Sequence, residues 1–139
     1  MAMDDIKRIV IPVDNTEDSK KAVEKGAYLA KILKVKAKII TVNDTHQFMS
    51  SVVLEEKLMK ETQSFLDNFK KLAETFGVEI ETELISGKPA DEIVKYAKEG
   101  DLIIMAHHDR TKGIDKMMEK SVSKEVVQNA PCSIFVVKS

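Results

Sequence analysis

The sequence DLIIMAHH, at residues 101–108, contains five consecutive apolar residues between polar neighbours. A short, continuous apolar run of this kind is typical of a strand that is buried on both faces. Strands buried on both faces belong to parallel sheets, because helices cover the two sides of such a sheet. We therefore expect residues 102–106 to form a central strand of a parallel sheet.

Short strands and amphipathic helices alternate on both sides of this run. Three further strands are expected before it and one after it, at residues 9–11, 39–42, 78–85 and 134–137. The stretches between them carry apolar residues at every third or fourth position, which indicates helices. Because right-handed crossovers join parallel strands, this order predicts an α/β fold, an open, doubly wound, mostly parallel five-stranded sheet with helices on both faces.

Local signals place the ends of the helices. Asn15 or Thr16 can cap the first helix, Gly77 stops the second as a C-cap would, and Pro89 suits the first position of the third. In the last helix the residues expected to face inward are Val122, Val126, Val127 and Ala130. Residues 78–85 alternate apolar and acidic side chains, which predicts a half-exposed edge strand.

Composition excludes several functional classes. The 139 residues are expected to form one domain, 1–139. The formal net charge is -1, and only 5% of the residues are aromatic. A chain without a basic excess or stacking aromatics is not expected to bind nucleic acid. No apolar run approaches the roughly 18 residues that span a bilayer, so we expect no membrane association. With Cys132 as the single cysteine, a reducing, cytoplasmic location is expected.

The expected fold also predicts where a ligand binds. In open parallel sheets, ligands bind outside the carboxyl ends of the strands, where the strand order reverses. That rule selects three segments of this chain, residues 12–16, 42–44 and 106–122.

Five stretches of the chain resemble one family. They are IVIPVD at 9–14, ISGKPA at 85–90, DLIIM at 101–105, SV at 121–122 and APCSIFVV at 130–137. In this order they are similar to the strands and turns of universal stress proteins, and the resemblance covers essentially the whole chain. It implies a sheet of order 3-2-1-4-5 and a homodimer paired through the last strand.

The resemblance also implies a nucleotide site. In the nucleotide-binding branch of the family, Asp14 and Val42 match residues that hold the adenosine half of ATP. A glycine motif after the fourth strand cradles the phosphates, and here its glycine positions hold Ala106, Asp109 and Lys120, with only Ser121 retained. The resemblance therefore implies a site whose adenosine half is kept and whose phosphate half is altered.

The candidate ligand-binding residues all belong to the three selected segments or to the strand ends beside them. They are Pro12, Val13, Asp14, Val42, Met105, Ala106, Asp109, Arg110, Lys120, Ser121 and Val122. No permanent cofactor is expected, and the candidate ligand is ATP or another adenine nucleotide.

Two of these assignments have structural alternatives. Asp14 is either a ligand anchor or a strand-end aspartate that caps the following helix or fixes the loop. Basic residues of the loop after the fourth strand, such as Arg110 and Lys120, either hold phosphates or belong to a solvated charged loop. The adjacent His107 and His108 point in different directions, and no ligand spacing accompanies them, so no metal site is expected.

The preferred function is a non-catalytic, dimeric binding and signalling protein of the stress response. The alternative is a functional ATP-binding member that uses the basic loop in place of the glycines. An adenylating ATP pyrophosphatase is excluded because the loop at 14–19, DNTEDS, lacks the glycines that hold pyrophosphate. A receiver domain is excluded because no phosphorylatable aspartate follows the third strand, where residues 86–89 are SGKP. No nucleophile has a paired base by sequence logic, so an enzyme is not expected.

Overall fold

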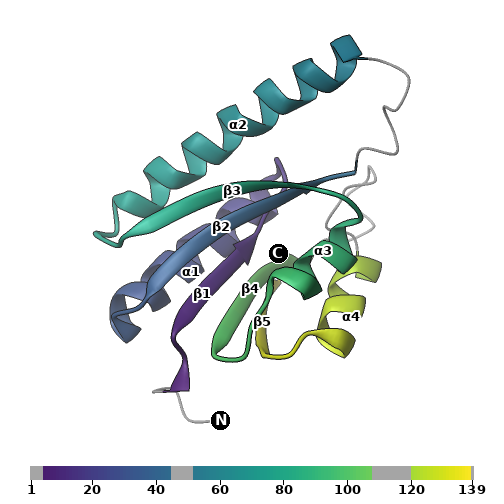
Figure 1. The fold of residues 1–139 in the computed structure, drawn as a ribbon. Coiled ribbons are helices and arrows are strands. Elements are labelled where there is room, and N and C mark those ends of the chain that lie inside the picture. The colour runs from purple at the N-terminus through teal and green to yellow at the C-terminus, as the bar shows by residue number, and fades with distance from the viewer. Residues whose placement is uncertain (1–4, 45–51, 108–119, 139) are drawn as a thin grey trace.

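The computed structural model describes residues 5–44, 52–107 and 120–138, in which strands and helices alternate along the chain (Figure 1). The strands are β1 (Arg8–Pro12), β2 (Lys36–Asn43), β3 (Ile80–Ser86), β4 (Asp101–His107) and β5 (Ser133–Lys138). The helices are α1 (Glu17–Leu33), α2 (Val52–Glu74), α3 (Pro89–Tyr96) and α4 (Lys120–Asn129).

The five strands form one sheet in the order β3-β2-β1-β4-β5, and all four pairings are parallel. The predicted α/β fold and strand order are confirmed. Strand β1 lies at the centre, where Arg8 is in register with Lys36 of β2 on one side and with Asp101 of β4 on the other. The strand order reverses between β1 and β4, because β2 and β3 extend to one side and β5 to the other.

Helices cover the sheet on both faces (Figure 1). Helices α1 and α2 bury one apolar cluster, to which β1 contributes Ile9 and Ile11 and α2 contributes Leu66. Helices α3 and α4 bury a second cluster against the opposite face, around Ile103 and Met105 of β4. Every residue from Asp101 to Ala106 is buried, so β4 is the doubly covered strand that its apolar run predicted.

Strand β3 forms one edge of the sheet, as its alternating pattern predicted. Its Glu81 and Glu83 are exposed on one face, while Ile80 is buried on the other. The Nζ atom of Lys38, on the neighbouring β2, lies 3.3 Å from a carboxylate oxygen of Glu81 and 3.4 Å from one of Glu83. These ion pairs join the exposed carboxylates of the edge strand to a lysine on the neighbouring strand.

Two local predictions were decided by geometry. Thr16 is the N-cap of α1, since its side chain accepts a hydrogen bond from the backbone N–H of Ser19. Helix α2 ends at Glu74, and Gly77 follows it in a turn with a φ of 77°. Gly77 therefore closes the turn that ends the helix, in the left-handed conformation expected of a glycine that stops one.

One prediction for α4 is wrong. Val126 is fully buried, whereas Val127 is 56% exposed. Neighbouring residues on an α-helix point about 100° apart, so the inward stripe of α4 includes Val126 and leaves Val127 outside it. The same stripe includes Ser123, a buried polar residue at a position where the apolar pattern gave no signal.

Candidate functional site

The carboxyl ends of β1, β2 and β4 lie next to one another, because these strands are neighbours in the sheet. We call this region the carboxyl edge. It brings together the predicted residues of three separate segments, including Asp14 after β1, Val42 in β2 and Ala106 in β4. It is also where the strand order reverses, which is the general place for ligands in open parallel sheets.

Asp14 is held in a compact polar network at the start of α1. It is only 4% exposed, and its backbone N–H donates to the hydroxyl of Ser19 over 2.9 Å. The Ser19 hydroxyl donates in turn to the Asp14 carboxylate over 2.8 Å, and Thr16 donates to the same carboxylate oxygen. Asp14 therefore fixes the loop before α1, while Thr16 caps the helix, and the role of Asp14 as a ligand anchor stays a prediction.

The loop after β1 is fastened to β2. The hydroxyl of Thr41 donates to the Val13 carbonyl over 2.8 Å, and the Val13 N–H donates to the Ile40 carbonyl over 2.8 Å. Both Val13 and Val42 are buried, with exposed fractions of 1% and 3%. The backbones of the two predicted adenosine-binding segments are therefore held at a fixed distance by contacts within the protein.

The other described candidates are core residues at the same edge. Pro12 is the buried last residue of β1. Met105 and Ala106 are almost fully buried and pack on opposite faces of the sheet, Met105 toward α3 and α4 and Ala106 toward α1 and α2. A ligand at the carboxyl edge would therefore rest on backbone and apolar side chains at these three positions.

The structure describes only part of the segment that the resemblance assigns to the phosphate motif. Lys120 and Ser121 are the first two residues of α4, and Val122 is half-buried in the cluster under α3 and α4. Asp109 and Arg110, and the side chains of Lys120 and Ser121, lie outside the described residues. Within the described part of the chain, no group of three or more His, Cys, Asp or Glu side chains is placed to hold a metal ion.

Two buried polar residues lie at this edge, of which the sequence included Asn43 only as part of the selected segment 42–44 and gave no signal for Thr62. Asn43, the last residue of β2, is 4% exposed, and Thr62 of α2 is 1% exposed. The Thr62 hydroxyl lies 3.3 Å from the side-chain amide of Asn43. A polar residue at the end of a strand looks like the beginning of a loop, and only the position of α2 shows that this one is buried.

Comparison with known families matches residues 5–138 to a single model, the universal stress protein family. The chain belongs to this family. The match covers all the described strands and helices, so the resemblance seen in the separate motifs holds along the whole fold.

Individual proteins are similar to this chain over most of their lengths. Universal stress protein MJ0531 of Methanocaldococcus jannaschii is 37% identical over 95% of this chain and 82% of its own length. The solved structure of the protein MJ0577 has a TM-score of 0.80 and 27% identity, and covers 96% of both chains. A universal stress protein from Archaeoglobus fulgidus, solved in complex with dAMP, has a TM-score of 0.68 and 20% identity over 96% of this chain and 98% of its own.

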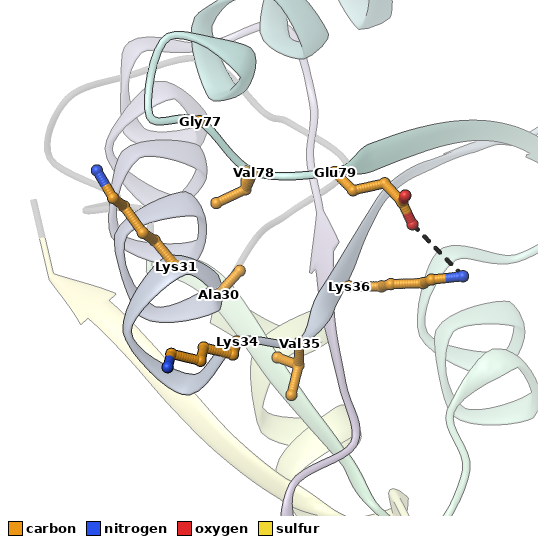
Figure 2. Close-up of a pocket in the computed structure, with 8 residues that line it drawn as sticks. All are labelled: Ala30, Lys31, Lys34, Val35, Lys36, Gly77, Val78 and Glu79. Carbon is orange, nitrogen blue, oxygen red and sulfur yellow. Dashed lines mark ion pairs between the residues drawn. The ribbon is translucent and has the colours of Figure 1, made fainter.

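This universal stress protein also has a pocket at the opposite end of the sheet, with a volume of about 340 Å³ (Figure 2). It lies between the end of α1 and the connection from α2 to β3. In Figure 2 the side chains of Lys31 and Lys34 point away from the pocket, and Lys36 is paired with Glu79 at 3.4 Å. Because the three lysine side chains point in different directions, they do not concentrate positive charge inside the pocket.

No helix within the described residues is both long and apolar enough to cross a membrane.

Proposed function

We propose that this chain is a non-catalytic, dimeric binding protein of the stress response whose carboxyl edge binds an adenine nucleotide through its adenosine half. The observation that carries the proposal is the fixed placement of Asp14 and Val42 at neighbouring strand ends, at the reversal of strand order. These are the positions that the family resemblance assigns to adenosine. A relative of the same fold was solved with dAMP, which is consistent with a monophosphate as ligand.

Geometry supports binding without catalysis. Ser19, a candidate nucleophile at this edge, is fully buried, and its hydroxyl bonds to Asp14 rather than to a histidine base. Burial raises the pKa of Cys132, the single cysteine, so its thiol is a weaker nucleophile at neutral pH than an exposed one. Neither group has the activation that a nucleophilic mechanism requires.

The proposed dimer rests on strand β5. It lies at the edge of the sheet opposite β3, and its Phe135 is 43% exposed. Its only charged residue is Lys138, at its end. An uncharged edge of this kind can pair with a second copy of itself about a two-fold axis, which forms a closed, isologous contact.

Calorimetry with AMP and adenosine tests the binding proposal. We expect both to bind with dissociation constants within a few-fold of each other, because the adenosine half supplies the contacts. Asp14→Asn keeps the size of the side chain and removes its charge, and should weaken binding about 10- to 100-fold. Asp91→Asn, an exposed residue in the first turn of α3, is the matched control and should leave binding unchanged. If AMP and adenosine do not bind to the wild-type protein, the proposal is wrong.

A further inference from the structure

Val127 of α4 is exposed at a position that is buried in α1. In α1, Gly26 packs against the sheet, and the residue that follows it, Ala27, is fully buried. In α4, Val126 packs against the sheet, whereas the residue that follows it, Val127, is 56% exposed. The two pairs of residues correspond, because each helix joins two neighbouring parallel strands. The difference in burial therefore comes from what lies beside each helix.

The direction of the second residue in each pair follows from the handedness of the crossover. A helix between parallel strands runs antiparallel to them, and its successive residues turn by about 100° in a right-handed sense. The residue after an inward-facing one therefore points sideways, toward the strand that the chain enters next. For Ala27 that side holds β2 and the helix beyond it, α2, which packs on α1. For Val127 that side is β5, the edge of the sheet, and no helix of the described chain lies beyond it.

The opposite edge of the sheet carries charge at the corresponding places. Its helix is α2, where the fully buried Leu66 is followed by the exposed, charged Asp67. Its strand is β3, which exposes two glutamates. At the β5 edge, both Val127 and Phe135 are exposed and apolar. Charged side chains protect an edge from association, whereas exposed apolar ones favour it. The β5 edge is therefore the one built to be covered.

The size of β5 requires that other elements contribute to a contact between two copies. A stable interface takes about 20–30 residues from each partner, and β5 has six. When two copies of an edge strand pair antiparallel about a two-fold axis, the sheets join and the α4 helices of the two copies lie on the same face. The second copy's α4 then has the place beside α4 that α2 has beside α1.

We infer that Val127 belongs to a surface by which this chain binds a second copy of itself, and that it packs there against the second copy's α4. This inference rests on the proposed dimer through β5, and it adds a pair of helices above the paired strands. Because the contact is isologous, Val127 occurs twice in each interface, so one substitution changes the interface at two places.

Sedimentation equilibrium with two matched valine variants tests the inference. Val127→Lys brings two like charges into the interface and should raise the dissociation constant of the dimer about 10- to 100-fold. Val53→Lys makes the same change at a valine of α2 that is 76% exposed, and should leave this constant unchanged within about twofold. Val127→Leu keeps the surface apolar and should retain the dimer. Circular dichroism of the diluted, monomeric proteins should give the same melting temperature for Val127→Lys and the wild type, since the residue is exposed in the single chain.

Chemical cross-linking tests which side of α4 meets the second copy. In a Cys132→Ala background, Val127→Cys supplies a single cysteine, and a short bismaleimide should join two copies through it. Glu125→Cys is the matched control, because this exposed residue lies about 200° from Val127 around the helix. It should give little cross-linked dimer.

Each failure has its own signature. If the wild type is dimeric and Val127→Lys dissociates no more readily than Val53→Lys, the inference is wrong and the proposed dimer stands. If Glu125→Cys cross-links as efficiently as Val127→Cys, the helices do not meet on the side inferred and the inference is wrong. If the wild type is monomeric at micromolar concentration, the proposed dimer and the inference are both wrong.

Discussion

Arg8 and Asp101, which are 93 residues apart in the chain, form a two-pronged ion pair between the adjacent strands β1 and β4. The Arg8 Nε lies 2.9 Å from Asp101 Oδ1, and the Arg8 Nη2 lies 2.7 Å from Oδ2. The guanidinium also lies over the ring of Tyr96, 4.9 Å from its centre, and the Asp101 carboxylate accepts the backbone N–H of Lys98 over 2.9 Å. Together these contacts fasten the amino end of β4 and the turn that precedes it to the centre of the sheet.

Removal of one member of this pair should strongly destabilise the fold. Asp101 is buried, and Asp101→Ala leaves the guanidinium without its partner, which typically costs about 3–5 kcal/mol. Replacement of both residues, with Arg8→Met and Asp101→Leu, should recover part of this loss because no unpaired charge remains. Urea unfolding measures the free energy of unfolding of the single and the double variant. Glu79→Ala, which breaks the exposed pair with Lys36, is the control and should cost less than about 1 kcal/mol. A cost for Asp101→Ala as small as the control's would show that the pair is not structural.

Gly26 lets α1 lie close to the sheet, and Gly26→Ala should destabilise the protein. A Cβ atom at this position would clash with Cδ1 and Cγ1 of Ile11, which is fully buried. The overpacking cost of about 1–3 kcal/mol should outweigh the gain in helix propensity, which is about 1 kcal/mol.

The same clash predicts a specific rescue. Ile11→Val removes Cδ1, the nearer of the two Ile11 atoms that the new methyl group would meet, and leaves Cγ1, 2.8 Å away, so the relief is partial. The double variant should therefore be more stable than the sum of the two single changes, by about 1 kcal/mol or more in urea unfolding. Additive effects would mean that Ile11 moves aside without cost.

Stability should fall as the solution becomes alkaline. Burial raises the pKa of the Cys132 thiol above its ordinary value of 9.0 and raises the pKa of Tyr96 in the same direction. Both groups bind their protons more tightly in the folded protein, so their contribution to stability is complete below the ordinary pKa and is lost as pH rises through the raised one. The free energy of unfolding, measured from pH 7 upward, should therefore decrease above about pH 9.

The Cys132 contribution can be measured on its own. Cys132→Ala should reduce the slope of this decrease, because it removes one of the two titrating groups. The rate at which iodoacetamide alkylates Cys132 should also be well below the rate for the same residue in the unfolded chain at pH 8. Equal rates in the two states would contradict the raised pKa.

The dimer through β5 predicts a mass of twice 15.6 kDa in sedimentation equilibrium at micromolar concentration. Val136→Pro should weaken this dimer by its effect on the edge strand, and Phe135→Lys should weaken it by placing a charge at an exposed apolar position. Tyr28→Lys changes a comparably exposed aromatic residue on α1 and should leave the dimer intact. A wild-type protein that is monomeric under these conditions would contradict the proposed assembly.

ATP is expected to bind weakly, with a dissociation constant above about 10 μM. The resemblance assigns Asp109 to a glycine position of the family's phosphate motif, and from that assignment we expect its carboxylate to repel the phosphates. Two unit charges about 6 Å apart repel by roughly 3 kcal/mol at an effective dielectric near 20, which corresponds to a factor of a hundred or more in affinity. Calorimetry with ATP beside AMP measures this difference. Tight ATP binding that is lost in Lys120→Ala would instead support a phosphate site rebuilt from basic residues.

Much of the fold follows from local patterns. The apolar run at 102–106 and the alternation at 78–85 predicted a doubly covered strand and an edge strand, because each pattern reflects how many faces of a strand meet water. Val127 was misassigned because two consecutive apolar residues on a helix do not show which of them faces the sheet. The candidate residues at the ends of β1, β2 and β4 followed from the expected topology, whereas their mutual contacts did not.

The sequence by itself determined the order of strands and helices and the edge at which the candidate residues gather, since hydrophobic periodicity and chain direction are local properties. Tertiary structure alone decided which polar groups are buried together and which of their hydrogen bonds are complete. Thr62 reaches Asn43 because α2 packs across the end of β2, and Arg8 reaches Asp101 because β1 and β4 are neighbours in register. Such contacts join distant parts of the chain, and their partners become defined only when the packed elements bring them within hydrogen-bonding distance.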